Sequence, residues 1–121
     1  MRKLIIVLLL VLLVGCTSKS DTIPLIIYDM KDDYMEDFER RIVSNANGII
    51  NVRTYDSRGS QVIQNELIEE LIENHPLLIV NPVDRLSAFT IIEKAKETNT
   101  PLIFINREPL STDLENSENV Y

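Results

Sequence analysis

The chain has 121 residues, of which 45% are hydrophobic and 26% are charged, so its length and composition favour one globular domain. Lys and Arg number 12 against 19 Asp and Glu, and the formal net charge of -7 argues against nucleic-acid binding, which needs a positive field. The single Cys, Cys16, and the single His, His75, exclude an internal disulfide and a Cys/His zinc cluster.

The first residues have the pattern of a secretory signal peptide. Two basic residues precede an apolar run over 4–14, which is shorter than the ~20 residues of a membrane-spanning helix. The run ends in Leu-Val-Gly-Cys, which resembles the lipobox of bacterial lipoproteins. We therefore expect residues 1–15 to be a lipoprotein signal peptide and Cys16 to carry lipid, which anchors the protein at the extracytoplasmic face of the cell membrane. An uncleaved anchor with an incidental Cys is the alternative.

Residues 16–22 are small and polar after the Cys, and we expect them to form a flexible tether. Beyond it, short apolar runs recur over 25–28, 49–52, 77–80 and 102–105, at a spacing typical of strand–helix–strand units. Three of the runs are apolar throughout, as in parallel strands covered on both faces. The second run, interleaved with Asn51 and Arg53, is predicted to lie at an edge.

The segments between these runs have helical periodicity. The apolar stripes comprise, in chain order, Met35, Phe38, Ile42 and Ala46; Ile63, Leu67 and Leu71, widened by Ile68 and Ile72; and Leu86, Phe89, Ile92 and Ala95 or Lys96. Asp33 and Glu36 are predicted to cap the first helix, and Asn99-Thr100-Pro101 to end the third. The sequence thus predicts a three-layer βαβαβαβ fold with a parallel sheet over 23–109, followed by a polar tail without periodicity over 110–121.

In parallel sheets, ligands bind beside the carboxyl ends of the strands. The candidate residues therefore lie in the segments 29–34, 56–60, 81–85 and 106–108. Asp32, just ahead of the predicted helix cap, and the neighbouring Tyr34 form a carboxylate–aromatic pair typical of sugar sites: the acid accepts bonds from two hydroxyls, and the ring packs on the C–H face. His75 precedes Pro76 at the opposite edge and is predicted to be a turn residue.

Other kinds of site fit the sequence poorly. Too few glycines follow the leader for a phosphate-binding loop, and the acidic residues after the first strand lack the spacing of a calcium loop. A receiver-like phosphoacceptor would need an Asp where Asn81 stands. The Glu-rich face of the second helix is predicted to be a solvated surface, with a docking face for a partner as the alternative.

Several segments in order resemble the galactose/glucose-binding proteins of methyl-galactoside ABC transporters, which are type I periplasmic-binding-protein-like sugar receptors. The resemblance covers residues 23–121 and rests on Ile27-Tyr28, residues 32–35, Asp56-Ser57, Gln64-Asn65, residues 81–84, residues 92–95 and residues 101–109. Its most specific part is Asn106-Arg107-Glu108-Pro109, which is similar to the family motif N-[KR]-E-P. The resemblance implies the amino-terminal lobe of such a receptor.

The resemblance also implies roles for individual residues. Asp32 matches the Asp that bonds sugar hydroxyls, Tyr34 the aromatic residue under the pyranose ring, and Asn106 an Asn that bonds the sugar from the same lobe. Arg107 stands where the family often has Lys, near the site, and is counted with these three as a predicted sugar-binding residue. The family's second lobe, with its calcium loop, has no counterpart in this sequence, so we expect no cofactor or metal in this chain.

We therefore predict a lipid-anchored sugar-binding component of an ABC importer, in a one-lobed or truncated form, with galactose, glucose or a methyl-galactoside as ligand and an ABC permease as partner. No nucleic acid is expected as a partner, and sugar binding by this chain alone should be weak or undetectable. The alternative is a half-lobe lipoprotein that acts as a protein-interaction or regulatory module without binding sugar. No enzyme is expected, because a hydrolase would need a paired acid and base on facing elements.

Overall fold

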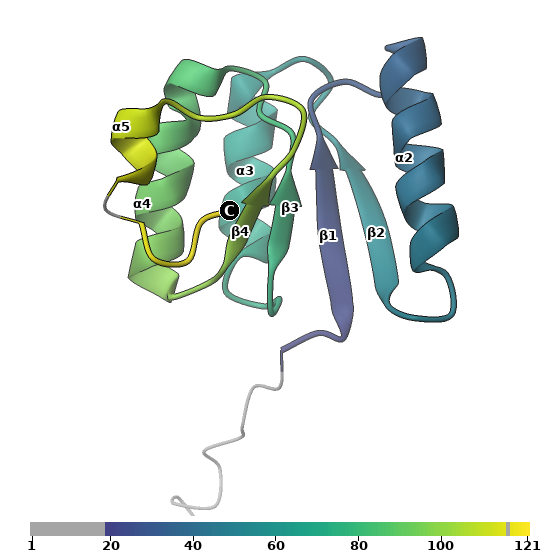
Figure 1. The fold of residues 1–121 in the computed structure, drawn as a ribbon, viewed down its shortest axis with the longest axis horizontal. Coiled ribbons are helices and arrows are strands. Elements are labelled where there is room, and N and C mark those ends of the chain that lie inside the picture. Colours follow the sequence, from purple (N-terminus) through teal and green to yellow (C-terminus); the bar gives the residue numbers. More distant parts are fainter. Residues whose placement is uncertain (1–18, 116) are drawn as a thin grey trace, which may run out of the picture.

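The computed structural model describes residues 19–115 and 117–121 (Figure 1). The predicted signal peptide and the predicted lipid attachment at Cys16 lie outside the described residues. The elements in order are β1 (Thr22–Ile27), α2 (Asp33–Ala46), β2 (Asn51–Asp56), α3 (Gln61–Leu71), β3 (Leu78–Val80), the 3₁₀ turn η1 (Arg85–Ser87), α4 (Ala88–Thr98), β4 (Leu102–Phe104) and α5 (Ser111–Leu114). No helix among the described residues is long and apolar enough to cross a membrane.

The four strands form one parallel sheet in the order β2-β1-β3-β4. All four arrows point the same way in Figure 1, so the loops that follow the strands gather at one edge of the sheet. β2 is the outermost strand on one side, as predicted, and the side chains of Asn51 and Arg53 on it are exposed. These observations confirm the predicted α/β class and the parallel sheet.

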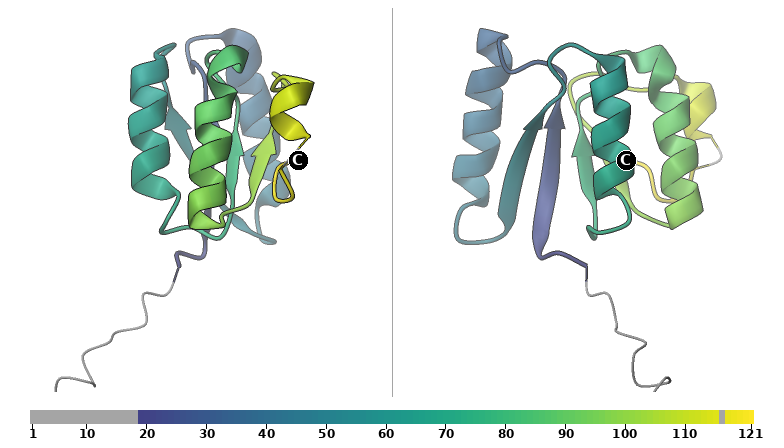
Figure 2. Two further views of the ribbon diagram at one scale, coloured as in Figure 1. Left: turned by 90° about the vertical axis from the view of Figure 1, so that its left-hand side faces the viewer. Right: turned by 180° about the vertical axis from the view of Figure 1, so that it is seen from behind.

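Helices cover the sheet from both sides, which confirms the three layers (Figure 2). Successive residues of a strand face opposite ways, so Leu25 and Ile27 of β1 pack with Met35 of α2, whereas Ile26 packs with residues of α3 and α4. The larger core comprises Ile26, Ile68, Leu71, Ile72, Leu78, Val80, Ile91, Ala95 and Leu102. The strand β1 is therefore apolar at every buried position because both of its faces are covered.

The second strand begins later than predicted. Residues 49 and 50 belong to the turn after α2, and Ile49 is 81% exposed. Gly48 has a φ of 79°, a left-handed conformation that glycine adopts without strain, and it redirects the chain there. The strand then runs over Asn51–Asp56 with alternating exposure, as an edge strand does. The prediction of a strand over 49–52 was wrong because two apolar residues in the turn were assigned to it.

Two helix details also differ from the prediction. The cap of α2 is Asp32 and not Asp33, since the Asp32 carboxylate accepts from the backbone N–H groups of Tyr34 and Met35. In the third helical segment, Leu86 and Phe89 are 66% and 54% exposed, so their place in the buried stripe was wrong. The buried residues of α4 are Ala88, Ile91, Ile92 and Ala95, because the 3₁₀ turn η1 changes the phase of the helix. The helix ends at Asn99-Thr100-Pro101, as predicted, and Asn99 at its C-cap has a left-handed conformation.

The segment after residue 109 has more structure than its polar sequence predicts. It contains the single-turn helix α5 and then returns along β4, where Val120 forms a parallel bridge with Leu102. The backbone of β4 is bonded to it at both ends: the Leu102 N–H donates to the Asn119 carbonyl at 2.9 Å and the Phe104 N–H to the Tyr121 carbonyl at 2.7 Å. The returning segment thus satisfies the outer edge of β4.

The central position of β1 gives a direct test of the fold. Ile26 of β1 is fully buried against the helices α3 and α4, so Ile26→Ala removes core contacts and leaves a cavity. The free energy of unfolding should fall by about 2–5 kcal/mol. Val62→Ala, at an exposed position of α3, should change it by less than about 0.5 kcal/mol. Urea unfolding followed by circular dichroism measures both, and equal effects would contradict this description of the core.

Candidate functional site

The loops that follow β2 and β3 are joined to the end of β1 by backbone hydrogen bonds, and the segment after β4 is joined to β3 by the bond from the Ile105 N–H to the Val80 carbonyl. The N–H groups of Ser57 and Gly59 donate to the carbonyls of Ile27 and Tyr28, at 2.9 Å and 2.7 Å, and the Asn81 N–H donates to Ile26 at 2.8 Å. The segments predicted to hold the site therefore lie together at one edge of the sheet (Figure 1). The end of β1 is the common support of this edge.

Asp32 is half-buried between the end of β1 and the start of α2. Its Oδ1 accepts from the N–H groups of Tyr34 and Met35, at 2.9 Å and 3.2 Å, and its Oδ2 accepts from the Tyr28 hydroxyl. An ionised carboxylate has about four lone-pair positions, so roughly one, on Oδ2, stays free for a ligand. The structure thus leaves about one acceptor position on Asp32 free, whereas the carboxylate–aromatic pattern predicts bonds from two hydroxyls.

The same contacts change the acidity of both partners. The hydrogen bond from Tyr28, followed by the backbone N–H of Met35, holds the pKa of Asp32 below its ordinary value. In turn the carboxylate of Asp32 is the main reason that the pKa of Tyr28 is raised, with burial adding to it. Asp32 is therefore an anionic acceptor at neutral pH, and Tyr28 stays a neutral donor.

Tyr34 and Asn106 lie at the surface of the same edge. Tyr34 is 63% exposed and stacks on Phe38 of its own helix, with ring centroids 6.0 Å apart and an interplanar angle of 13°. Asn106 is exposed, and its φ of 61° puts it at the tip of a tight turn after β4, which Asn tolerates better than most residues. Both side chains are accessible to a ligand, as their predicted role requires.

Arg107 points inward from the same turn. Its guanidinium lies over the ring of Tyr28, 4.0 Å from the centroid, and its Nη1 donates to the carbonyls of Pro82 and Val83 at 3.2 Å and 2.6 Å. The structure therefore joins Arg107 to Asp32 through Tyr28. The sequence pattern gave Tyr28 no role in the site, although it is the first residue after β1.

A buried polar network supports the edge from below. Gln64 of α3 is fully buried; its Nε2 donates to Ser57 Oγ and to the Asn81 carbonyl, both at 3.0 Å, and its Oε1 accepts from the Val83 N–H at 3.0 Å. One side chain thus connects the loops after β2 and β3. The local sequence did not predict this buried role of Gln64, because a polar residue in an amphipathic helix is expected to lie on the exposed face.

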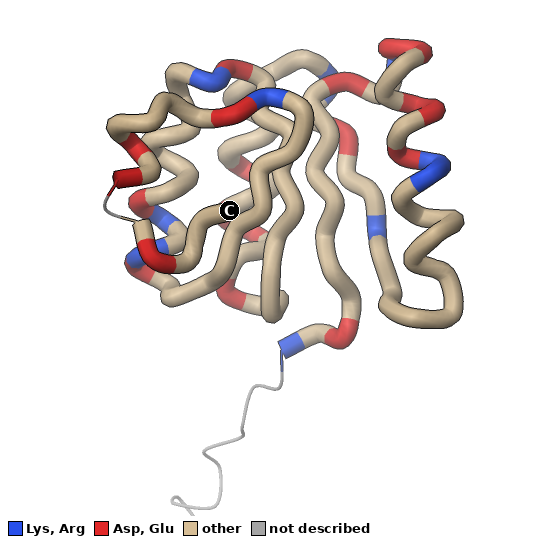
Figure 3. The backbone as a smooth tube through the Cα atoms, viewed as in Figure 1, with Lys and Arg blue, Asp and Glu red and all other residues tan. Residues whose placement is uncertain are grey.

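In the part of the chain that the structure describes, the remaining polar residues form no second site of the kinds considered. His75 is buried in the turn before β3, at the opposite edge as predicted, with Nδ1 2.8 Å from the Leu71 carbonyl oxygen. Within residues 19–115 and 117–121, no three His, Cys, Asp or Glu side chains are grouped to hold a metal ion. Basic residues are scattered among acidic ones along the part of the backbone drawn in colour in Figure 3.

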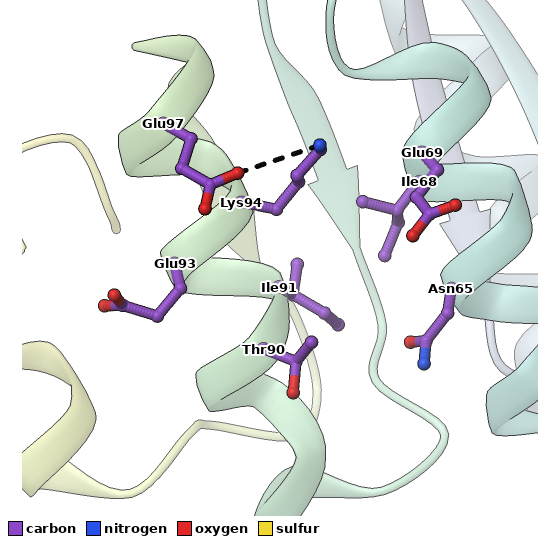
Figure 4. A pocket seen from close by; sticks show the side chains of 8 residues that line it. All are labelled: Asn65, Ile68, Glu69, Thr90, Ile91, Glu93, Lys94 and Glu97. Atoms are coloured by element: carbon purple, nitrogen blue, oxygen red, sulfur yellow. Dashed lines mark ion pairs between the residues drawn. The ribbon is translucent and has the colours of Figure 1, made fainter.

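A shallow groove of about 310 Å³ lies between α3 and α4 (Figure 4). Ile68 and Ile91 contribute its apolar part, and Lys94 lies 3.7 Å from the carboxylate of Glu97 at its rim. None of the residues predicted to bind sugar lines it. The groove is therefore separate from the edge where the strands end.

Comparison with known proteins agrees with the family resemblance. No protein-family model matches the chain. It is 32% identical over 107 residues to the D-galactose/methyl-galactoside binding periplasmic protein MglB of Haemophilus influenzae, an overlap of 86% of this chain and 32% of that protein. The chain thus spans about a third of the length of the curated relative that it matches.

Solved structures show the same fold. An ABC transporter periplasmic solute-binding protein from Actinobacillus succinogenes, with bound D-allose, superposes with a TM-score of 0.70 at 18% identity, over 79% of this chain and 35% of that one. The myo-inositol binding protein of Caulobacter gives 0.71 at 14% identity, over 80% and 34%. The chain therefore has part of the type I periplasmic-binding-protein fold, and its sequence is related to that of a galactose-binding periplasmic protein. These relatives are binding proteins, in agreement with the expectation that the chain is not an enzyme.

The network around Gln64 predicts a measurable loss of stability. Gln64→Leu keeps the size of the side chain but leaves the Val83 N–H and the Asn81 carbonyl without their partner. A buried polar group without a partner costs about 1–3 kcal/mol; the Asn81 carbonyl is such a group and the Val83 N–H is partly buried, so the free energy of unfolding should fall by about 1–3 kcal/mol. Glu66→Ala, at an exposed position of the same helix, is the matched control and should change it by less than about 0.5 kcal/mol. Equal unfolding midpoints in urea would show that the network does not support the loops.

Proposed function

We propose that this chain provides one lobe of a sugar receptor that works outside the cytoplasmic membrane with an ABC importer. The observation that carries the proposal is the position of three residues at the edge where the strands end: Asp32 caps α2, Tyr34 lies in the first turn of α2, and Asn106 lies in the turn after β4. The relative MglB, named for binding D-galactose and methyl-galactoside, supports a monosaccharide of this class as the ligand.

The chemistry of the three residues fits a sugar. Asp32 is an anionic acceptor whose free position on Oδ2 suits a single hydroxyl donor. The exposed ring of Tyr34 offers an apolar face to the C–H groups of a pyranose, and its stacking on Phe38 fixes the orientation of that face. The amide of Asn106 both donates and accepts, so it can pair with a further hydroxyl.

Galactose, glucose and methyl-galactosides are the proposed ligands, and an ABC permease is the proposed partner. Receptors of this kind close two lobes on a ligand by a hinge, and the closed shape is what a permease distinguishes. The groups described here contact a sugar from one side only. Hydroxyls that keep their bonds to water gain little from such contacts, so the affinity of this chain alone should be in the millimolar range or weaker.

Sugar binding is best tested by NMR titration of the ¹⁵N-labelled full chain, kept in a detergent whose headgroup is not a sugar. D-galactose, D-glucose and methyl-β-galactoside should give saturable shifts of the amides of Tyr34 and Asn106. Asp32→Asn should abolish these shifts: Asn caps helices as well as Asp does, so α2 stays capped while the anionic acceptor is lost.

Asp33→Asn is the matched control, because Asp33 is the adjacent carboxylate and is exposed outside the cap. This variant should keep the shifts of the wild-type chain. No saturable shift with any of the three sugars, or an equal loss in both variants, would contradict a sugar site at Asp32. A dissociation constant in the micromolar range would show instead that one lobe suffices for tight binding.

We also propose that Cys16 carries a lipid anchor, on the grounds of the basic residues, the apolar run and the lipobox-like residues before it. The full chain expressed in a bacterium should lose residues 1–15 and partition into detergent with the added mass of its acyl chains. Cys16→Ser should abolish the added mass, whereas Ser18→Ala should retain it. Intact mass spectrometry of the detergent phase decides, and an unmodified Cys16 with residues 1–15 still attached would refute the anchor.

A further inference from the structure

Arg107 contacts the loops that follow two other strands of the sheet. Its guanidinium lies 4.0 Å from the centroid of the Tyr28 ring, after β1, and it donates to the carbonyls of Pro82 and Val83, after β3. Arg107 itself follows β4. From the turn after β4, its side chain thus contacts the segments that follow β1 and β3, and these contacts hold the guanidinium against the protein.

Tyr28 continues this chain of contacts to the carboxylate. One face of its ring receives Arg107, and its hydroxyl donates to Asp32 Oδ2. The other carboxylate oxygen is fixed by the N–H groups of Tyr34 and Met35. Because both oxygens are held, the plane of the carboxylate is set before any ligand arrives.

We propose that Tyr28 and Arg107 are positioning residues for sugar binding: Tyr28 orients the Asp32 carboxylate, and Arg107 fixes Tyr28 without touching the ligand. The proposal rests on the proposed function, because it assigns the arrangement of that same site. A group that is already held in its binding geometry loses less conformational freedom when a ligand binds. The affinity for sugar therefore depends on Tyr28, which contacts Asp32, and on Arg107, which contacts Tyr28.

Arginine is suited to this position for a geometric reason. Its planar guanidinium can stack on the Tyr28 ring and donate in its own plane to the two carbonyls at the same time. A lysine keeps the charge but offers no plane to stack. A substitution of Arg107 by Lys therefore separates the effect of charge from the effect of shape.

The charged groups around the pair come from several loops. Asp29 lies beside Tyr28 and acts to raise its pKa, whereas Arg107 acts to lower the pKa values of both Tyr28 and Asp32. Asp56, the last residue of β2, is an acidic residue whose carboxylate accepts from the Met30 N–H at 3.1 Å. Lys31 and Asp33 flank Asp32 in sequence and are exposed. The neighbouring charges other than Arg107 are the same in every variant of Tyr28 or Arg107, so a change in the pKa of Asp32 reports the substitution itself.

The test is an NMR titration of the side-chain carboxyl carbon of Asp32 in the full chain without sugar. Tyr28→Phe keeps the ring under Arg107 and removes only the hydroxyl, so the pKa of Asp32 should rise. Arg107→Gln should also raise it, and Arg107→Lys should restore it toward the wild-type value. Arg85→Gln, which removes a positive charge from the exposed turn η1, should leave it unchanged. An unchanged pKa in Tyr28→Phe would overturn the proposal.

Sugar titrations of the same variants complete the test. Tyr28→Phe and Arg107→Gln should weaken the binding of D-galactose roughly fivefold, and Arg107→Lys should weaken it too, since the charge alone does not fix the ring. Amide spectra establish that each variant is folded, and Tyr28→Phe, the smallest change, carries the test if a variant of Arg107 does not fold. Wild-type affinity in all folded variants would refute the positioning role.

The two proposals fail in different ways. If the wild-type chain shows no sugar binding while Tyr28→Phe still raises the pKa of Asp32, the proposed function is wrong and the orientation of the carboxylate stands. If sugar binds but neither variant alters the pKa or the affinity, the positioning role is wrong and the proposed function stands.

Discussion

The whole candidate site depends on β1, a strand that is buried on both faces and paired on both edges. Residues Pro24 to Ile27 are buried, β2 and β3 flank the strand in parallel, and its last carbonyls accept hydrogen bonds from the loops after β2 and β3. A rigid strand at the centre of the sheet therefore fixes where three loops begin. Tyr28 is the next residue and Asp32 lies four residues further on, so the buried strand fixes the position of the Asp32 carboxylate.

Asp32 serves the fold and the proposed site at the same time. As the cap of α2 it satisfies two N–H groups that would otherwise have no partner at the start of the helix. Those bonds, with the one from Tyr28, hold the carboxylate in its charged form and leave a single direction free. The structural role thus narrows the chemical one: the cap that keeps Asp32 anionic also limits it to one hydroxyl.

Much of the fold could be predicted from the sequence because a strand buried on two faces is apolar at consecutive positions. The runs at β1, β3 and β4 are apolar without interruption, whereas Arg53 reveals the edge strand β2. Apolar residues in turns misled the prediction, as Ile49 and Ile50 did, because hydrophobicity alone does not report the turn at Gly48. The exposed pair Leu86 and Phe89 misled it for a related reason: a 3₁₀ turn changes the helical phase within a few residues.

The candidate site follows from the positions of the strands in the sequence, but its internal contacts could not be predicted. The rule that ligands bind at the ends of parallel strands selects the segments of Asp32, Tyr34 and Asn106 from strand positions alone. The stacking of Arg107 on Tyr28 joins the ends of β4 and β1, and no local pattern records a contact between residues so distant in sequence.

The contacts within the candidate site also limit how tightly one lobe can bind a sugar. The contacts that order Asp32 are made in the free protein, so they lower the cost of binding but add no new bond to the sugar. Only the bonds formed to the ligand, and the water removed from around it, add affinity, and a sugar resting on an open edge keeps much of its water. The polar contacts of this edge are thus better suited to choosing the orientation of a sugar than to retaining it. Under the proposed function, retention of a sugar therefore requires a second surface that closes over the edge, whereas the free acceptor position on Asp32 and the exposed ring of Tyr34 would set the orientation of the sugar.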